Sequence, residues 1–189
     1  MGNKQKSTVA LNLCIEAARQ TGRLPVEVSF SDDEITYPGT DEYVERTHTR
    51  PEICLDWVVL DTPLANIFSR TRPFFWPFDK TLQEIDWIKP FPKNARRLPE
   101  TDIRNAVLPE YYPPPRGKKL ICLLGIRAAE SFNRRLSIYA AKGFLTQPNA
   151  YGVYTAKPIY DWNSGDVWKA ITDNHWDYNQ AYDTFIKFK

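Results

Sequence analysis

The 189-residue sequence predicts an α/β protein built around a parallel β-sheet. Two observations lead to this fold class. Segments with helical and with extended patterns alternate in the amino-terminal third, and strands that are separated by helices usually pair in parallel. Farther along, residues 120–124 form a continuous apolar run, which is typical of a strand whose two faces are both covered. We expect one compact domain, because this length is usual for a single core.

The amino-terminal third supplies the alternating elements. A helix is expected over residues 7–21, with a capping hydroxyl at its start and Gly22 at its end. Short β-branched sequence predicts strands at 25–30 and 53–60, and a helix that a threonine can cap is expected between them at 40–48. This order of elements predicts the first part of the parallel sheet.

Residues 72–115 interrupt the alternation with an aromatic and proline-rich insertion. Its prolines disfavour long helices and strands. Its aromatic side chains, including the run Phe74–Phe78, would be costly to expose, so the insertion is expected to pack onto the sheet or against a partner. Two alternatives stay open: an irregular packed cover, or a surface for base stacking, for a second copy of the chain or for another protein.

Regular structure is expected to resume after this insertion. Gly125 would allow a tight exit from the apolar strand, and Asn163 or Ser164 would cap a later helix. The expected elements are, in order, a strand at 120–124, a helix at about 128–142, a loop at 151–157, a helix at about 164–173 and a last helix from residue 178.

Composition narrows the classes of function. The formal charge of +2, from 25 basic and 23 acidic residues, gives no global field for nucleic acid or a membrane surface. No apolar run is long enough for a membrane helix, and the start of the chain lacks the apolar stretch of a signal peptide, so a cytoplasmic protein is expected. Cys14, Cys54 and Cys122 are widely separated in apolar sequence, which predicts reduced core thiols. His48 and His175 are expected at the surface or at helix ends.

Residues 125–135 concentrate three arginines and a glutamate where a strand becomes a helix. Ligands of open parallel sheets bind beyond the carboxyl ends of the strands, and the arginine fork suits phosphate or sulfate. Arg127, Arg134 and Arg135 therefore predict an anionic ligand. Glu130 would orient Arg127 through a charge-assisted bond or pair with it on the helix surface. From the residues alone, a solvated helix face explains the arginines equally well.

Two motifs make the chain resemble the phosphoadenosine phosphosulfate reductase family, which is related to the ATP pyrophosphatases. They are Gly125-Ile-Arg-Ala-Ala-Glu-Ser131 and Pro158-Ile-Tyr-Asp-Trp-Asn-Ser-Gly-Asp-Val-Trp168. The resemblance spans essentially the whole chain. It implies a three-layer, doubly wound parallel sheet of the adenine nucleotide alpha-hydrolase-like class, and an adenine nucleotide, ATP or an adenylyl sulfate, as the ligand held by Gly125, Arg127, Glu130, Arg134 and Arg135.

In this family a Ser-Gly-Gly-Lys-Asp-Ser-Thr loop, the PP-loop, cradles phosphate or sulfate with backbone amides ahead of a helix. Residues 1–8, Met-Gly-Asn-Lys-Gln-Lys-Ser-Thr, occupy its place, with an asparagine for the second glycine and without the aspartate. A strand usually precedes this loop in the family, so we expect a fragment or a shortened relative with a less protected sheet edge. The resemblance implies phosphate or sulfate contacts from Gly2, Asn3, Lys4, Ser7 and Thr8.

Asp32, Asp33 and Glu34, followed by Tyr37-Pro-Gly-Thr40, resemble another family segment, Asp-x-Glu and then Tyr-Pro-x-Thr. The resemblance implies that these carboxylates contact the nucleotide, through a ribose hydroxyl or through Mg²⁺. From the residues alone, a solvated acidic turn is the alternative. Mg²⁺ that accompanies the nucleotide is the only cofactor implied.

Reductases of this family use a cysteine in a carboxyl-terminal Glu-Cys-Gly motif, and the sequence contains no cysteine after Cys122. The chain therefore looks closer to relatives without that cysteine, several of them from phages and mobile elements. No catalytic residue is assigned. Two functions stay open: a nucleotide-dependent enzyme that acts at the phosphate or sulfate end of its ligand, and a non-catalytic accessory protein whose insertion at about 72–115 binds a partner.

Overall fold

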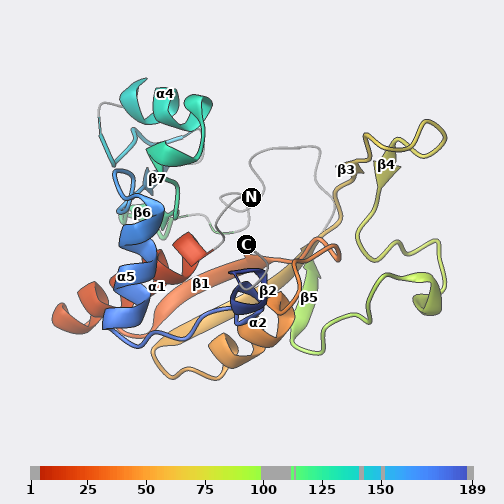
Figure 1. Cartoon of the computed structure of the whole chain (residues 1–189), viewed down its shortest axis with the longest axis horizontal. Coiled ribbons are helices and arrows are strands. Elements are labelled where there is room, and N and C mark those ends of the chain that lie inside the picture. The colour runs from red at the N-terminus through yellow and green to blue at the C-terminus, as the bar shows by residue number, and fades with distance from the viewer. Residues whose placement is uncertain (1–4, 99–111, 113, 141–142, 150–151, 187–189) are drawn as a thin grey trace. The chain divides into compact units, whose positions relative to one another are not determined.

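The computed structural model describes residues 5–98, 112, 114–140, 143–149 and 152–186. Helices and parallel strands are mixed along the chain (Figure 1), which confirms the predicted α/β fold class. Two compact units are present: unit 1 comprises residues 1–24 and 108–180, and unit 2 comprises residues 25–107 and 181–189. Unit 2 therefore interrupts the sequence of unit 1. The expected single domain stays a prediction, because a division by contacts does not test independent folding.

Unit 2 holds a three-stranded parallel sheet in the order β1-β2-β5. Its strands are β1 (Val26–Ser31), β2 (Ile53–Leu60) and β5 (Ala95–Leu98), and α2 (Thr40–His48) connects the first two. The bounds of α2 and β2 agree with the prediction, and β1 differs by one residue. Sequence analysis missed β5, because this strand has four residues, two of them arginines, and follows a proline-rich stretch.

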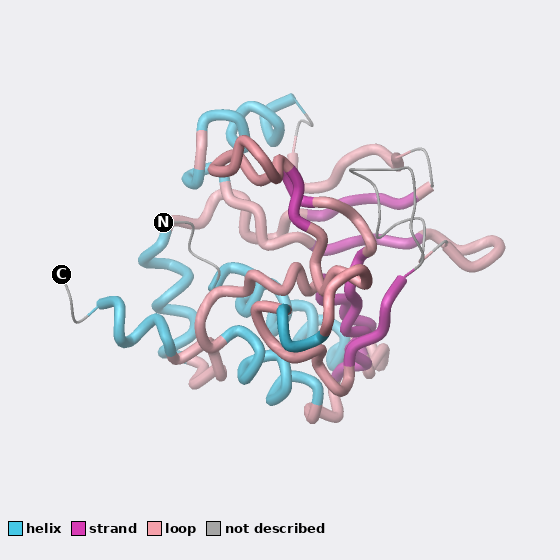
Figure 2. Tube along the Cα trace, turned by 90° about the vertical axis from the view of Figure 1, so that its right-hand side faces the viewer, coloured by secondary structure: helices cyan, strands magenta, loops and turns pink. Residues whose placement is uncertain are grey.

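The described part of the insertion in unit 2 consists mostly of loops, which Figure 2 draws in pink. A short antiparallel hairpin joins β3 (Leu64–Ala65) to β4 (Phe74–Phe75), and a single 3-10 turn, η1 (Glu84–Asp86), follows. Phe78 is fully buried and meets Phe91 edge to face, with ring centroids 5.0 Å apart. Part of the insertion is therefore the packed cover that the sequence predicts.

Unit 1 contains a two-stranded parallel sheet and several helices. Val9, Val167 and Ile171 form its buried core together with Ile159, so that the helix near the amino terminus packs against a helix near the carboxyl terminus. The elements are α1 (Gln5–Gln20), β6 (Leu120–Leu123), η2 (Ala128–Glu130), α4 (Phe132–Ala140), β7 (Val153–Ala156) and α5 (Ser164–Asp173).

Several predictions for the second half of the chain are wrong. The predicted loop at 151–157 contains β7, whose Val153 and Ala156 are buried. The predicted helix at 128–142 is divided, because Ser131 is extended and its Oγ accepts a hydrogen bond from Arg134 N, so that α4 begins only at residue 132. The last helix, α6 (Ala181–Ile186), begins three residues later than expected.

The start of α1 also differs from the prediction. The helix begins at Gln5, so Ser7 and Thr8 lie within its first turn and do not cap it. Its end agrees with the prediction: Gly22 has a φ of +65°, and Arg23 N donates to Ala18 O at 2.8 Å. Asn163 caps α5 as predicted, in a reciprocal arrangement with Asp166.

The three cysteines are free thiols, but Cys54 is exposed, contrary to the expected core position. Burial raises the pKa of the Cys14 and Cys122 thiols, which makes them less reactive. Both histidines are exposed near helix ends, as expected. Among the described residues, no helix has the length and apolar character needed to cross a membrane.

Candidate anion-binding site

Two segments that are distant in the sequence, the first turn of α1 and residues 127–134, meet at the start of α1 in unit 1. Lys6 lies in the first turn of that helix, Arg127 and Glu130 follow β6, and Arg134 lies on α4. Lys6 Nζ is 2.7 Å from Glu130 Oε1, Arg134 also forms an ion pair with Glu130, and Arg127 Nε is 3.7 Å from Glu130 Oε1. We call these four residues the Glu130 cluster.

Gly125 permits this meeting. A Cβ atom at this position would lie 2.7 Å from the carbonyl oxygen of Lys6 and 3.0 Å from the backbone nitrogen of Ser7. The backbone that leaves β6 is therefore in direct contact with the first turn of α1. Only glycine allows so close an approach, and any other residue would push the two segments apart.

Arg127 is the most deeply buried cation of the cluster, with a side chain 3% exposed. Its Nη1 donates long hydrogen bonds to Trp162 O at 3.4 Å and to Ser164 Oγ at 3.5 Å. Its Nε has no hydrogen-bond partner within the described part of the chain. Buried donors are rarely left without an acceptor, because the loss of hydration costs free energy. The open donor of Arg127 therefore marks a position that an acceptor beyond the described residues would complete.

The cluster has an excess of positive charge, since three cations contact one carboxylate. Burial, followed by repulsion from Arg134 and Arg127, lowers the pKa of Lys6 from 10.5 to about 8. Burial and Arg134 also lower the pKa of Arg127, although the carboxylate of Asp166 acts in the opposite direction. The Arg127 guanidinium nevertheless stays charged. A bound anion would relieve this repulsion.

The residues predicted to form the phosphate loop are only partly described. Gly2, Asn3 and Lys4 lie outside the described residues, so their contacts stay predictions. Ser7 is exposed in the first turn of α1. Thr8 is buried, and its hydroxyl donates to Gln5 Oε1 at 3.3 Å, which ties it to the helix itself. In the structure, neither hydroxyl makes a contact of the Glu130 cluster.

The cluster contains one residue that sequence reasoning did not select and lacks one that it did. Arg135 is exposed on α4 and makes none of the contacts that define the cluster. Lys6 was missed, although a signal existed: a basic residue in the first turn of a helix is unfavourable with the helix dipole and needs a nearby anion. That first turn contains no acidic residue, and the anion is Glu130.

The predicted acidic residues belong to unit 2, and the structure does not bring them into the Glu130 cluster. Glu34 is buried, has a φ of +62°, and accepts hydrogen bonds from the backbone amides of Phe78 and Ile88. Asp33 is exposed in the same turn. Glu34 therefore fastens the insertion to the end of β1. Its predicted contact with a nucleotide is untested.

Asp32 and Asp41 of unit 2 share an ammonium group and form no open cation site. Lys89 Nζ lies 2.9 Å from Asp32 Oδ2 and 2.7 Å from Asp41 Oδ2, so an ammonium group holds the position between them. Asp32 Oδ2 also accepts a hydrogen bond from the indole of Trp57 at 3.0 Å. Within the described ranges, no three His, Cys, Asp or Glu side chains are grouped so that they could hold a metal ion.

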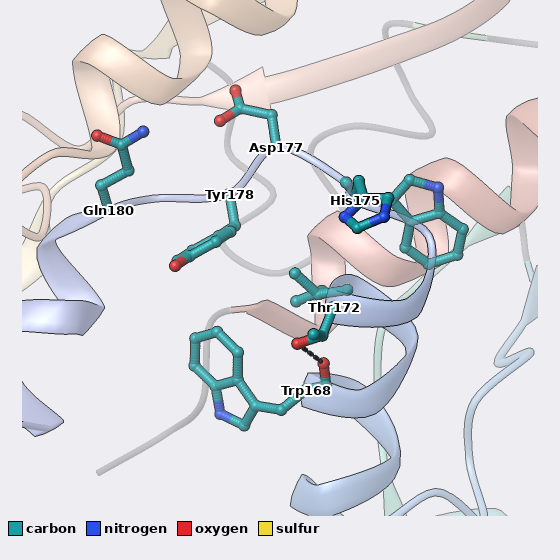
Figure 3. A pocket seen from close by; sticks show the side chains of 8 residues that line it. Trp168, Thr172, His175, Asp177, Tyr178 and Gln180 are labelled. Carbon is teal, nitrogen blue, oxygen red and sulfur yellow. Dashed lines mark hydrogen bonds between the residues drawn. The ribbon is translucent and has the colours of Figure 1, made fainter.

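A second concave feature lies around the carboxyl end of α5 (Figure 3). Trp168 and Tyr178 meet edge to face, with ring centroids 5.5 Å apart, and the Thr172 hydroxyl donates to the carbonyl of Trp168. The open pocket has a volume of about 520 Å³ and is lined by Trp168, Ile171, Thr172, His175, Trp176, Asp177, Tyr178 and Gln180. Its lining contains no lysine or arginine, so the pocket lacks the positive charge of the Glu130 cluster.

Comparison with known proteins shows which family the chain is similar to. The model of the phosphoadenosine phosphosulfate reductase domain family matches residues 2–186. The uncharacterized protein YbdN of Escherichia coli strain K12 is 25% identical over 185 residues, a match that covers 86% of this chain and 44% of that protein. The chain thus spans less than half the length of this relative.

A solved structure is also similar. Phosphoadenylyl-sulfate reductase from Candida auris, in a phosphate complex, superposes with a TM-score of 0.51 and 16% sequence identity, covering 95% of this chain and 73% of that one. At this level of identity the likeness shows a common fold and leaves the ligand open.

Proposed function

The chain belongs to the phosphoadenosine phosphosulfate reductase domain family, and from this premise we propose that unit 1 binds the anionic end of an adenine nucleotide at the Glu130 cluster. The nucleotide is ATP or an adenylyl sulfate. The proposal concerns binding first, and turnover at the phosphate or sulfate end second.

One observation carries the proposal. Arg127 is almost completely buried, yet its Nε has no acceptor among the described residues. Lys6 and Arg134 form ion pairs with the same Glu130, and Lys6 lies in the first turn of α1. A helix amino terminus beside a buried guanidinium whose Nε lacks an acceptor among the described residues is a favourable place for phosphate or sulfate.

The chemistry that these residues support is the orientation and charge compensation of an anion. Arg127 would donate from Nε, and Lys6 and Arg134 would add positive charge. None of the three cysteines belongs to the Glu130 cluster, so thiol-driven reduction has no support in the cluster. Any Mg²⁺ is proposed to enter with the phosphates of the nucleotide, since the described carboxylates offer it no site.

Isothermal titration of the purified protein tests this function. The ligands are ATP, adenylyl sulfate and adenosine bisphosphate, each with and without Mg²⁺. We expect saturable binding of at least one, weakened about 30-fold or more by Arg127→Ala because a buried charge-assisted donor is lost. Arg23→Ala removes an exposed arginine of the same unit and should bind as the wild type does. If folded wild-type protein binds none of these ligands, the proposal is refuted.

A second candidate function, partner binding without catalysis, is supported by a different observation. Ile67 and Phe68, at the tip of the β3-β4 hairpin, are 83% and 94% exposed. Side chains as apolar as these are seldom so exposed together unless a partner covers them. A stable oligomer in native mass measurement, lost in the double variant Ile67→Ser, Phe68→Ser and combined with no nucleotide binding, would select this function.

A further inference from the structure

Two buried atoms of the Glu130 cluster have no hydrogen-bond partner within the described residues. One is a donor, Arg127 Nε, and the other is an acceptor, Glu130 Oε1; they lie 3.7 Å apart. Lys6 Nζ is 2.7 Å from Glu130 Oε1, but its hydrogen bond of good geometry goes to Oε2 at 2.8 Å. A donor and an acceptor that lack partners of good hydrogen-bond geometry among the described residues therefore stand side by side, although the Lys6 ammonium contacts the acceptor as an ion pair.

This pair defines the chemistry of the group that would complete it. The group must accept one hydrogen bond and donate another, as the oxygen of a hydroxyl does. A fully ionised oxygen could accept from Arg127, but it has no proton to offer Glu130, and two negatively charged oxygens would then face each other. A site completed in this way would discriminate between anions that carry a proton and anions that do not.

The charge of the cluster further limits the chemical groups that could complete this pair. Water and sugar hydroxyls also donate and accept, but they are neutral, whereas three cations surround the single carboxylate. A protonated phosphate oxygen meets both requirements, since the P–OH group donates and the remaining oxygens carry negative charge. A sulfate group at neutral pH supplies the charge without the proton.

We propose that Glu130 makes this site selective for a protonated phosphate group over a fully ionised anion such as sulfate. The inference rests on the anion binding proposed above and narrows it, because a phosphate end that carries a proton is favoured over the sulfate end of an adenylyl sulfate. In the complete site, the P–OH oxygen accepts a hydrogen bond from Arg127 Nε and donates one to Glu130 Oε1. Lys6 and Arg134 balance the remaining charge.

Inorganic phosphate and inorganic sulfate form a matched pair of probes. At about pH 8, above the second pKa of phosphate, both are tetrahedral dianions, and only phosphate keeps a proton. Titration of the whole wild-type protein with each salt should show tighter binding of phosphate by about tenfold or more, because sulfate leaves Glu130 without a donor. Equal affinities would overturn the selectivity and leave anion binding intact. Binding of neither anion would count against the proposed function itself.

Glu130→Gln separates the discriminating role from a merely structural one. The glutamine amide keeps the shape and donates to a sulfate oxygen, so the ratio of the two affinities should fall to within about threefold. This ratio is the readout, because removal of a negative charge strengthens the binding of both anions. Glu16→Gln, at an exposed glutamate of α1 paired with Arg19, should keep the wild-type ratio. A wild-type ratio in folded Glu130→Gln would refute the assignment, and the wild-type titrations decide alone if that variant does not fold.

Discussion

Two buried glutamates, Glu34 in unit 2 and Glu130 in unit 1, are held by different kinds of donor. Glu34 accepts hydrogen bonds from the backbone amides of Phe78 and Ile88. Glu130 is contacted by the side-chain cations of Lys6 and Arg134, with Arg127 slightly farther away. Backbone amides are fixed by the fold and carry no net charge, so the arrangement at Glu34 is complete as it stands.

The difference shows which property of a buried charge indicates a ligand. Burial is similar at the two sites, with Glu34 3% exposed and the side chain of Glu130 8% exposed. What distinguishes the Glu130 cluster is an unmatched donor, an unmatched acceptor and an excess of cations. We therefore compare Glu34, whose observed contacts hold the insertion, with the proposed binding site at the Glu130 cluster. The following experiments test this comparison.

The largest effect is expected from Glu34→Ala. The change leaves the backbone amides of Phe78, which is buried, and of Ile88, which is partly buried, without their carboxylate acceptor. This should lower the free energy of unfolding by about 2–4 kcal/mol in urea titrations. Phosphate affinity should be unchanged, because Glu34 belongs to the packing of unit 2. Glu27→Ala, at an exposed position of β1, should cost less than about 0.5 kcal/mol. Loss of phosphate binding in folded Glu34→Ala would abolish the distinction between the two glutamates.

The next effect is expected from Gly125→Ala. The added Cβ would meet the carbonyl oxygen of Lys6 at 2.7 Å, so the first turn of α1 must move away from β6. We expect a loss of about 1–3 kcal/mol in the free energy of unfolding, and phosphate binding weakened about tenfold as Lys6 is displaced. Gly117→Ala is the control, since its Cβ would meet nothing within 4 Å. That variant should bear some backbone strain, with phosphate affinity as in the wild type.

A smaller effect on the stability of the folded protein is expected from a change of pH, through Lys6. Lys6 has a pKa of about 8 in the folded protein against an ordinary 10.5, so the unfolded chain holds this proton over the interval in which the folded chain has released it. The contribution of Lys6 to stability is therefore unfavourable below about pH 8 and becomes less so as pH rises toward 10.5.

Anion binding should follow the opposite trend, because the ammonium charge is lost above about pH 8. Sulfate affinity should fall several-fold between about pH 7 and pH 9, where the ligand itself does not titrate. Lys6→Met should remove this step. Lys169→Met, at an exposed lysine paired with Asp173, should retain it. A flat pH profile in the wild type would show that Lys6 makes no contact with the anion.

The smallest effect on phosphate affinity is expected when the neighbouring arginines Arg134 and Arg135 are replaced by alanine. Arg134 pairs with Glu130 but is 43% exposed, so Arg134→Ala should weaken phosphate binding only about three- to tenfold. Arg135→Ala should change it by less than about twofold, because the side chain is exposed and outside the cluster. Titrations at low salt give the comparison. Equal losses in the two variants would mean that the arginines act as a diffuse positive surface.

Sequence patterns predicted the elements that local preferences determine. α2 and β2 have the predicted bounds, and the long β-branched run of β2 leaves little choice. The predicted cap of α2 is wrong, because Thr40 is the first residue of the helix and the N-cap is Gly39, without a side-chain hydrogen bond. The short strands β5 and β7 were missed, since each has four residues and takes its conformation from pairing with a neighbouring strand. A strand of this length has no periodicity to recognise.

The candidate site was predicted in part for a related reason. The motif at 125–135 identified Arg127, Glu130 and Arg134, which the structure brings together. It gave no means of placing Glu34, whose donors lie 44 and 54 residues away along the chain. The role of a buried carboxylate depends on which donors the fold brings to it, and those contacts are not local in sequence.

The separation of Lys6 from Glu130 by 124 residues has a consequence for the order of folding. During synthesis, the first turn of α1 is made long before its counter-ion, and all of residues 25–107 of unit 2 are made in between. Closing so long a loop costs conformational entropy and slows the contact. The basic first turn of α1 must therefore remain without its counter-ion while the intervening unit is synthesised, so that phosphate binding would report that unit 1 has finished folding.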